Sequence, residues 1–168
     1  MLTSSDIARV LTHYDLGTAE GIAATGHGFV NETVVVATAR GRFVIRRNHR
    51  RFSLAAIQYR HQLINALCRR SFPTARLIPT RTGDTVAVVD GRVYETLEYI
   101  SGTDFDVHRP EQITATGAIL ASYHRAVGDC AAPVETPAPR YAPSRIPALS
   151  ETLYERDVMG ELHDDLAW

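Results

Sequence analysis

The sequence predicts an α+β fold in which five mostly antiparallel strands form one sheet, with a helix inserted after the third strand. The β-branched run at 33–38 is typical of a strand. Two hairpin signals, Ala39-Arg40-Gly41-Arg42 and Asp90-Gly91, each separate two apolar stretches. Between these hairpins, 53–72 carries apolar residues at helical spacing. Five mostly antiparallel strands with one helix inserted after the third are typical of an α+β sheet lobe.

The elements follow in order. Ser4 or Ser5 can cap a first helix that Gly17 ends, with Ile7, Val10, Leu11 and Tyr14 on one face. Ser53 can cap the central helix, whose expected inward residues are Leu54, Ile57, Leu63, Ile64, Leu67 and Cys68. We expect strands at 21–25, 33–38, 43–47, 85–89 and 92–99. A third helix is expected from Pro110 to Val127, with Ile113, Ile119, Leu120 and Tyr123 inward. After a linker with prolines at 133, 137, 139, 143 and 147, a last helix is expected from about Ser150, with Leu153, Val158, Leu162 and Leu166 on its apolar face.

Composition excludes several classes of protein. The 168 residues carry a formal net charge of −1, which gives no general attraction to nucleic acid or anionic membranes. Neither a signal peptide nor an apolar run of membrane-spanning length is present, so we expect a cytoplasmic protein that does not contact the membrane. All 18 basic residues are arginine, so a role that usually needs lysine falls to arginine or is missing.

Residues 26–47 are the most informative stretch, because a turn with Gly26 and Gly28 precedes two strands and the second ends at Arg46 and Arg47. Backbone N–H groups in such a turn, together with a fixed positive charge, suit a nucleotide phosphate. An ordinary hairpin turn is the alternative interpretation of the glycines, and a solvated strand end is the alternative for Arg46.

The order of five motifs resembles the aminoglycoside phosphotransferase, choline kinase and type II homoserine kinase superfamily, which has a protein-kinase-like fold. The motifs are Gly28-Phe-Val-Asn31, Gly41-Arg-Phe-Val-Ile-Arg46, Phe72-Pro-Thr-Ala-Arg-Leu-Ile78, the stretch 94–102, and Leu120-Ala-Ser-Tyr-His124. The resemblance covers about residues 5–127. It implies a nucleotide-binding lobe at 1–100, then a hinge and an incomplete helical lobe at 101–168.

The resemblance implies ATP with Mg²⁺ as cofactors and a small-molecule hydroxyl as the phosphoryl acceptor. The residues it assigns to nucleotide binding are Gly26, Gly28, Phe29, Asn31, Arg46, Glu98, Tyr99 and Ile100. In this interpretation the turn covers the phosphates, Arg46 contacts the α and β phosphates, and the backbone of 98–100 reads the adenine edge. A packed or capping role is the expectation for His124.

Two departures from the family pattern stand out. Arg60 aligns with the helix glutamate that usually pairs with the third-strand basic residue, so that ion pair is in doubt; two arginines would repel unless an anion lies between them. The family's catalytic loop and metal-binding aspartate are not found, and His163-Asp164-Asp165-Leu166 fits the polar face of a helix better than a catalytic loop. We therefore expect a chain truncated before the catalytic and metal-binding aspartates, with no catalytic residue and no metal ligand of its own.

Three functions remain open at this stage. The first is an ATP-dependent phosphotransferase, of which this chain alone only binds nucleotide. The second is a non-catalytic, pseudokinase-like interaction module. The third is binding of nucleic acid by His49 and the arginines of 40–51. It is disfavoured because the net charge is near zero and charge clusters are usually solvated.

Overall fold

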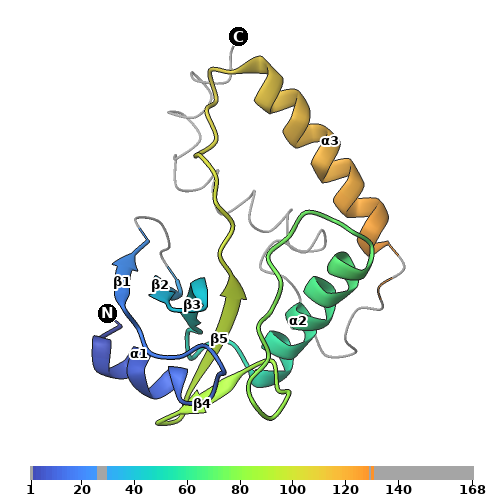
Figure 1. Cartoon of the computed structure of the whole chain (residues 1–168). Coiled ribbons are helices and arrows are strands. Elements are labelled where there is room, and N and C mark those ends of the chain that lie inside the picture. Colours follow the sequence, from blue (N-terminus) through green and yellow to red (C-terminus); the bar gives the residue numbers. More distant parts are fainter. Residues whose placement is uncertain (1, 26–29, 129, 131–168) are drawn as a thin grey trace, which may run out of the picture. The chain divides into compact units, whose positions relative to one another are not determined.

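The computed structural model describes residues 2–25, 30–128 and 130 (Figure 1). Eight elements follow one another in this part of the chain, and their order is the one that the sequence predicts. They are α1 (Ser4–Leu11), β1 (Gly21–Ala24), β2 (Glu32–Thr38), β3 (Gly41–Arg47), α2 (Leu54–Arg69), β4 (Ala87–Val89), β5 (Arg92–Glu98) and α3 (Pro110–Val127).

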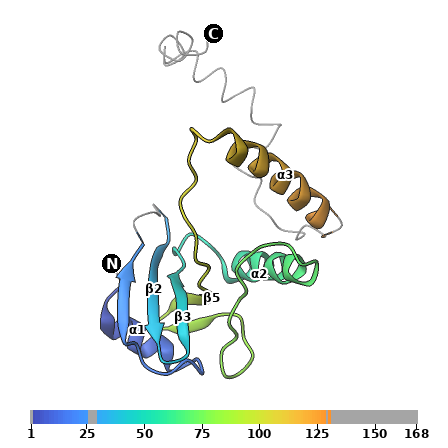
Figure 2. The same ribbon diagram turned by 45° about the horizontal axis from the view of Figure 1, so that its top comes forward.

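The five strands form one sheet in the order β1-β2-β3-β5-β4, and every neighbouring pair is antiparallel (Figures 1 and 2). The predicted α+β sheet lobe with a helix after its third strand is therefore confirmed. Asp90 and Gly91 join β4 to β5 with φ values of 49° and 67°, the left-handed conformations that a tight hairpin turn requires. In the middle of the sheet β3 pairs with β5, so residues far apart in the sequence become direct neighbours.

Helix α1 covers one face of the sheet. Its four expected inward residues are all buried, in a core that they share with Val34, Val36, Ile45, Ala87, Val89 and Tyr94. Its boundaries differ from the prediction: Thr3, not Ser4 or Ser5, is the N-cap, because Thr3 and Asp6 form a reciprocal capping box. The helix ends at Leu11, well before Gly17, which lies in the following loop with φ of 81°.

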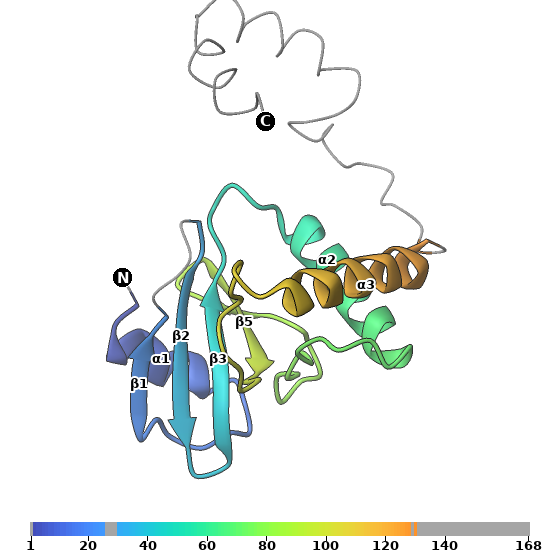
Figure 3. The same ribbon diagram turned by 90° about the horizontal axis from the view of Figure 1, so that it is seen from above.

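Helix α2 lies on the opposite face of the sheet, because its Arg60 and His61 contact Glu95, whose neighbour Tyr94 packs in the core with α1. Figure 3 shows α1 next to β1 and β2, and α2 beyond β5. Ser53 caps α2 as predicted, since its side chain accepts from the Ala56 amide N–H at 3.2 Å. Only part of the expected inward set is buried, and Leu54, in the first turn, is 44% exposed. The helix also buries His61, a polar residue that the apolar pattern did not select.

Helix α3 begins at Pro110 and ends at Val127, as the sequence predicts. Its expected inward face is wrong for this structure: Ile113, Ile119 and Leu120 are each about half exposed. The reason is that α3 meets the described chain mainly at the end of α2, where the rings of Phe72 and Tyr123 lie 6.0 Å apart.

The predicted proline-rich linker and last helix lie outside the described residues. No helix in the described part of the chain is long and apolar enough to cross a lipid bilayer.

Candidate functional site

A buried carboxylate, Glu95 of β5, lies at the centre of a polar cluster that joins β3, β5 and α2. Its Oε1 accepts from Arg46 Nη1 at 2.9 Å, and its Oε2 accepts from Arg60 Nη2 at 2.7 Å. His61 Nε2 also lies 2.5 Å from Oε2. The Glu95 side chain has no exposed surface, whereas the side chains of Arg46 and Arg60 are each about one-third exposed.

Sheet register and helix geometry bring these side chains together. Arg46 of β3 is directly opposite Glu95 of β5, so the two side chains leave the sheet on the same face. Their neighbours Ile45 and Tyr94 point to the other face, into the core beneath α1. Arg60 and His61, which follow one another in α2, place a guanidinium and an imidazole against the Glu95 carboxylate.

Asn48 fixes the Arg60 side chain from a second direction. Its Oδ1 accepts from Arg60 Nη2 at 2.8 Å, and its backbone N–H donates to the Val93 carbonyl oxygen at 2.9 Å. Asn48 follows β3 directly and is only 3% exposed, so its side chain is a buried acceptor. The Arg60 side chain is thus hydrogen-bonded both to Asn48 and to Glu95 of β5.

The electrostatic environment keeps Glu95 ionised. Burial, the largest single influence, raises the pKa of this carboxyl because it penalises the charged form. Hydrogen bonds from His61 and Arg60, and the charges of Arg60 and Arg46, together outweigh burial and lower the pKa to about 2 from its usual 4.5. Since an ionised carboxylate only accepts hydrogen bonds, His61 Nε2 carries the proton in this contact.

Arg60 was expected to face Arg46 without the usual glutamate, and the structure shows what lies between them. The anion is Glu95, which comes from β5 rather than from the helix. Arg46, the basic residue of the third strand, therefore does form an ion pair with a carboxylate. The carboxylate belongs to β5 and not to the helix. The sequence contained one signal for it: a glutamate inside an otherwise apolar strand stretch is rarely buried unless it is paired.

Of the residues predicted to form the phosphate turn, Gly26, Gly28 and Phe29 lie outside the described residues. Asn31 is described, and its Oδ1 accepts from the His49 backbone N–H at 3.0 Å. This contact ties the end of the turn to the loop after β3. Beside it, Arg47 forms an ion pair with Glu32.

The predicted hinge residues lie where β5 ends. The Glu98 backbone N–H donates to the Arg76 carbonyl oxygen at 2.9 Å, so this N–H is already engaged. The Arg42 guanidinium lies 4.1 Å from the centre of the Tyr99 ring, and Ile100 is 58% exposed. Glu98 and Ile100 also line a cavity of about 470 Å³ together with Cys68, Ser71, Phe72, Pro73, Thr74 and Arg76.

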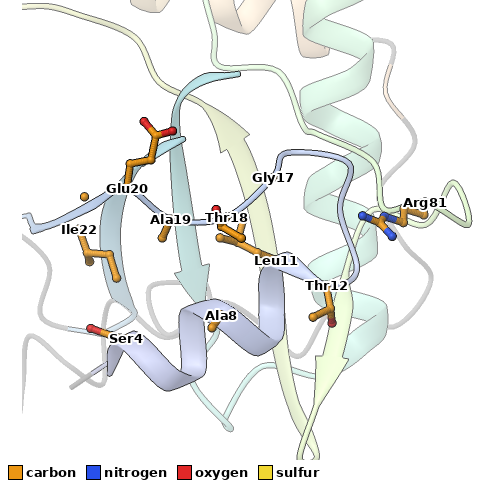
Figure 4. Close-up of a pocket in the computed structure, with 11 residues that line it drawn as sticks. Ser4, Ala8, Leu11, Thr12, Gly17, Thr18, Ala19, Glu20, Ile22 and Arg81 are labelled. Carbon is orange, nitrogen blue, oxygen red and sulfur yellow. The ribbon is translucent and has the colours of Figure 1, made fainter. Parts of the chain in front are cut away.

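A larger pocket, of about 750 Å³, lies on the α1 side of the molecule (Figure 4). It is lined by Ser4, Ala8, Leu11, Thr12, Gly17, Thr18, Ala19, Glu20, Gly21, Ile22 and Arg81. None of the predicted nucleotide-binding residues lines this pocket, and the Glu95 side chain lies on the other face of the sheet. The volume of a pocket therefore does not by itself identify the candidate nucleotide site.

Residues 2–25, 30–128 and 130 contain no group of three or more His, Cys, Asp or Glu side chains that could hold a metal ion. Two arginines and one carboxylate leave a surplus positive charge at a partly exposed position.

Comparison with solved structures defines the fold class. A microcompartment-associated aminopropanol kinase matches with a TM-score of 0.69 at 19% identity, covering 86% of this chain and 46% of that one. Amicoumacin kinase, solved with AMP-PNP and Ca²⁺, matches with a TM-score of 0.68 at 13% identity, covering 79% of this chain and 42% of the other. The fold is that of the small lobe of protein-kinase-like proteins, followed by a helix.

The sequence profile of the phosphotransferase enzyme family matches residues 21–167, and the chain belongs to this family. Homoserine kinase of Caulobacter vibrioides is 26% identical over 125 residues, which are 74% of this chain and 39% of the relative. Homoserine kinase of Beijerinckia indica is 25% identical over 130 residues, 77% of this chain and 40% of the relative. The chain thus spans about two-fifths of the length of these relatives, and the predicted resemblance is confirmed for an N-terminal portion.

Proposed function

We propose that the chain is the nucleotide-binding portion of a cytoplasmic kinase that transfers the γ-phosphoryl group of ATP to a hydroxyl of a small molecule. The observation that carries the proposal is the bridge from Arg46 to Glu95, which holds a cation on the central strands of a phosphotransferase-family sheet. Since the matched relatives are homoserine kinases, homoserine is the first acceptor to test in the complete protein.

In this proposal each predicted residue has one role. Arg46 binds the α and β phosphates, and its bond to Glu95 fixes the guanidinium so that little side-chain freedom is lost on binding. The turn with Gly26, Gly28, Phe29 and Asn31 covers the phosphates, and the backbone of 98–100 contacts adenine.

Mg²⁺, when bound with ATP, neutralises charge on the β and γ phosphates. No described residue is assigned to hold it, and no catalytic residue is assigned in this chain. Accordingly, the proposed activity of the 168-residue chain by itself is binding of nucleotide without turnover.

Isothermal titration calorimetry with Mg-ATP tests the proposal. The unmodified chain is expected to bind, and Arg46→Gln is expected to weaken binding at least tenfold because it removes the charge and the donors that face the phosphates. Arg40→Gln is the matched control, since Arg40 pairs with Asp15 on the exposed surface. Absence of binding at millimolar Mg-ATP, or equal losses in the two variants, contradicts the proposal.

A non-catalytic, pseudokinase-like interaction module is the second candidate. It is favoured by the arginine at the position of the helix glutamate, and by the half-exposed apolar residues Ile113, Ile119 and Leu120 of α3. Retained nucleotide binding together with phosphoryl transfer to homoserine by the complete protein would exclude it. Binding to a protein partner without turnover would favour it.

A further inference from the structure

The cluster around Glu95 has more positive charge than one ion pair requires. Arg46 and Arg60 each carry a full positive charge, and Glu95, with its lowered pKa, supplies the single negative charge between them. The Glu95 carboxylate is fully buried, whereas about one-third of each arginine side chain is exposed. An anion that approaches from solvent therefore meets two cations before it meets the carboxylate.

Both arginines also have N–H groups that no described acceptor uses. A guanidinium has five N–H donors. Arg46 donates to Glu95 through one nitrogen, Nη1. Arg60 donates to Glu95 and Asn48 through one nitrogen, Nη2. Arg60 Nε is buried without a hydrogen-bond partner in the described chain. A buried donor without an acceptor is costly, and phosphate oxygens are strong acceptors for guanidinium groups.

The sheet register places Arg46 next to the start of β2. Arg46 is directly opposite Thr33 of β2, two residues after Asn31. The two guanidinium groups share one carboxylate at this end of β3, next to the start of β2.

We propose that Arg60 binds the phosphate groups of the nucleotide together with Arg46, and that Glu95 is the positioning residue that holds the two guanidinium groups side by side. The inference rests on the proposed nucleotide binding. In the family pattern one basic residue pairs with a glutamate on the helix. Here the acid stands on β5 and the helix supplies a second cation, so the chain grips the polyphosphate with two arginines.

Calorimetric titration of the 168-residue chain with Mg-ATP, adenosine and inorganic tripolyphosphate tests this arrangement. Arg60→Gln is expected to weaken Mg-ATP and tripolyphosphate binding at least tenfold and to leave adenosine binding unchanged, because adenosine has no phosphate. Arg69→Gln, the same change at an exposed position of the same helix, is expected to stay within twofold of the unmodified chain. Glu95→Gln is expected to lower the ratio of ATP affinity to adenosine affinity, which a merely structural role would not alter.

The outcomes separate the two proposals. If the unmodified chain binds Mg-ATP and folded Arg60→Gln binds it equally well, the role of Arg60 is overturned while nucleotide binding stands. If the chain binds tripolyphosphate through Arg60 but binds no nucleotide, the anion site stands and the proposed function fails. Failure to bind either ligand overturns both.

A second variant keeps the test decisive if Arg60→Gln does not fold. Arg60→Lys keeps the charge toward Glu95 but lacks the planar fork of donors. It is expected to lose several-fold in affinity for Mg-ATP and none for adenosine. Equal losses for both ligands, or no loss for Mg-ATP, contradict the role of Arg60 in phosphate binding.

Discussion

Replacing Glu95 by glutamine should destabilise the fold in a manner that depends on pH. The carboxyl has its pKa lowered from 4.5 to about 2 in the folded chain. At about 1.4 kcal/mol for each pH unit, ionised Glu95 contributes about 3 kcal/mol of folding free energy at pH 7. Because the two arginine side chains are partly exposed, solvent screens their charges and the measured loss should be smaller than this value.

The sign follows from the direction of the pKa change. Because folding lowers the pKa, the stabilisation is fully present above the unfolded value of 4.5 and is lost as the pH falls towards about 2. The difference in stability between the unmodified chain and Glu95→Gln should therefore be constant between pH 5 and 7. Below pH 4.5 it should shrink. Asp6, whose pKa is also lowered to about 2, chiefly by its backbone hydrogen bond with Thr3, is common to both proteins and cancels in the difference.

Urea denaturation at pH 7, 5, 4 and 3, followed by circular dichroism, measures this difference. Glu98→Gln is the matched control on the same strand, because the Glu98 side chain is half exposed and its nearest cation, Arg76 Nε, is 3.9 Å away. The control should change the unfolding free energy by less than about 1 kcal/mol. A loss in Glu95→Gln that is the same at pH 3 and pH 7, or no loss at all, would refute the electrostatic account of the cluster.

Two further predictions concern local structure, and urea denaturation at pH 7 measures both. Thr3→Ala should lower the unfolding free energy by about 1 kcal/mol because it removes the acceptor of the Asp6 amide N–H. Ser4→Ala should leave the unfolding free energy nearly unchanged. A larger loss for Ser4→Ala than for Thr3→Ala would instead support Ser4 as the N-cap. Gly117→Ala should stabilise the chain by about 0.5–1 kcal/mol, because a Cβ at this position in α3 meets nothing within 4 Å. Gly41→Ala should destabilise it, since φ is 122° there; equal effects at the two glycines would contradict the argument.

The sequence was sufficient for the element order and for most of the sheet. Turn residues such as Asp90-Gly91 and the β-branched run of β2 have strong local preferences, so their structure depends little on distant contacts. Boundaries were less certain. Thr3 competed with Ser4 and Ser5 for the same cap, and the reciprocal bond to Asp6 decided between them.

The inward faces of the helices depended on what each helix meets. Ile57 is buried because the sheet covers it, while Ile113 on α3 has the same apolar character and is about half exposed. Periodicity predicts which residues share a face of a helix. It cannot say whether another element covers that face.

The sequence by itself determined the family, the order of strands and helices, and the presence of a basic residue at Arg46. Only the tertiary structure decided which carboxylate pairs with it. Glu95 is 49 residues from Arg46 and 35 from Arg60, and no local pattern links them. The antiparallel register of β3 and β5 and the packing of α2 make them neighbours, and burial of the shared carboxylate then requires both cations.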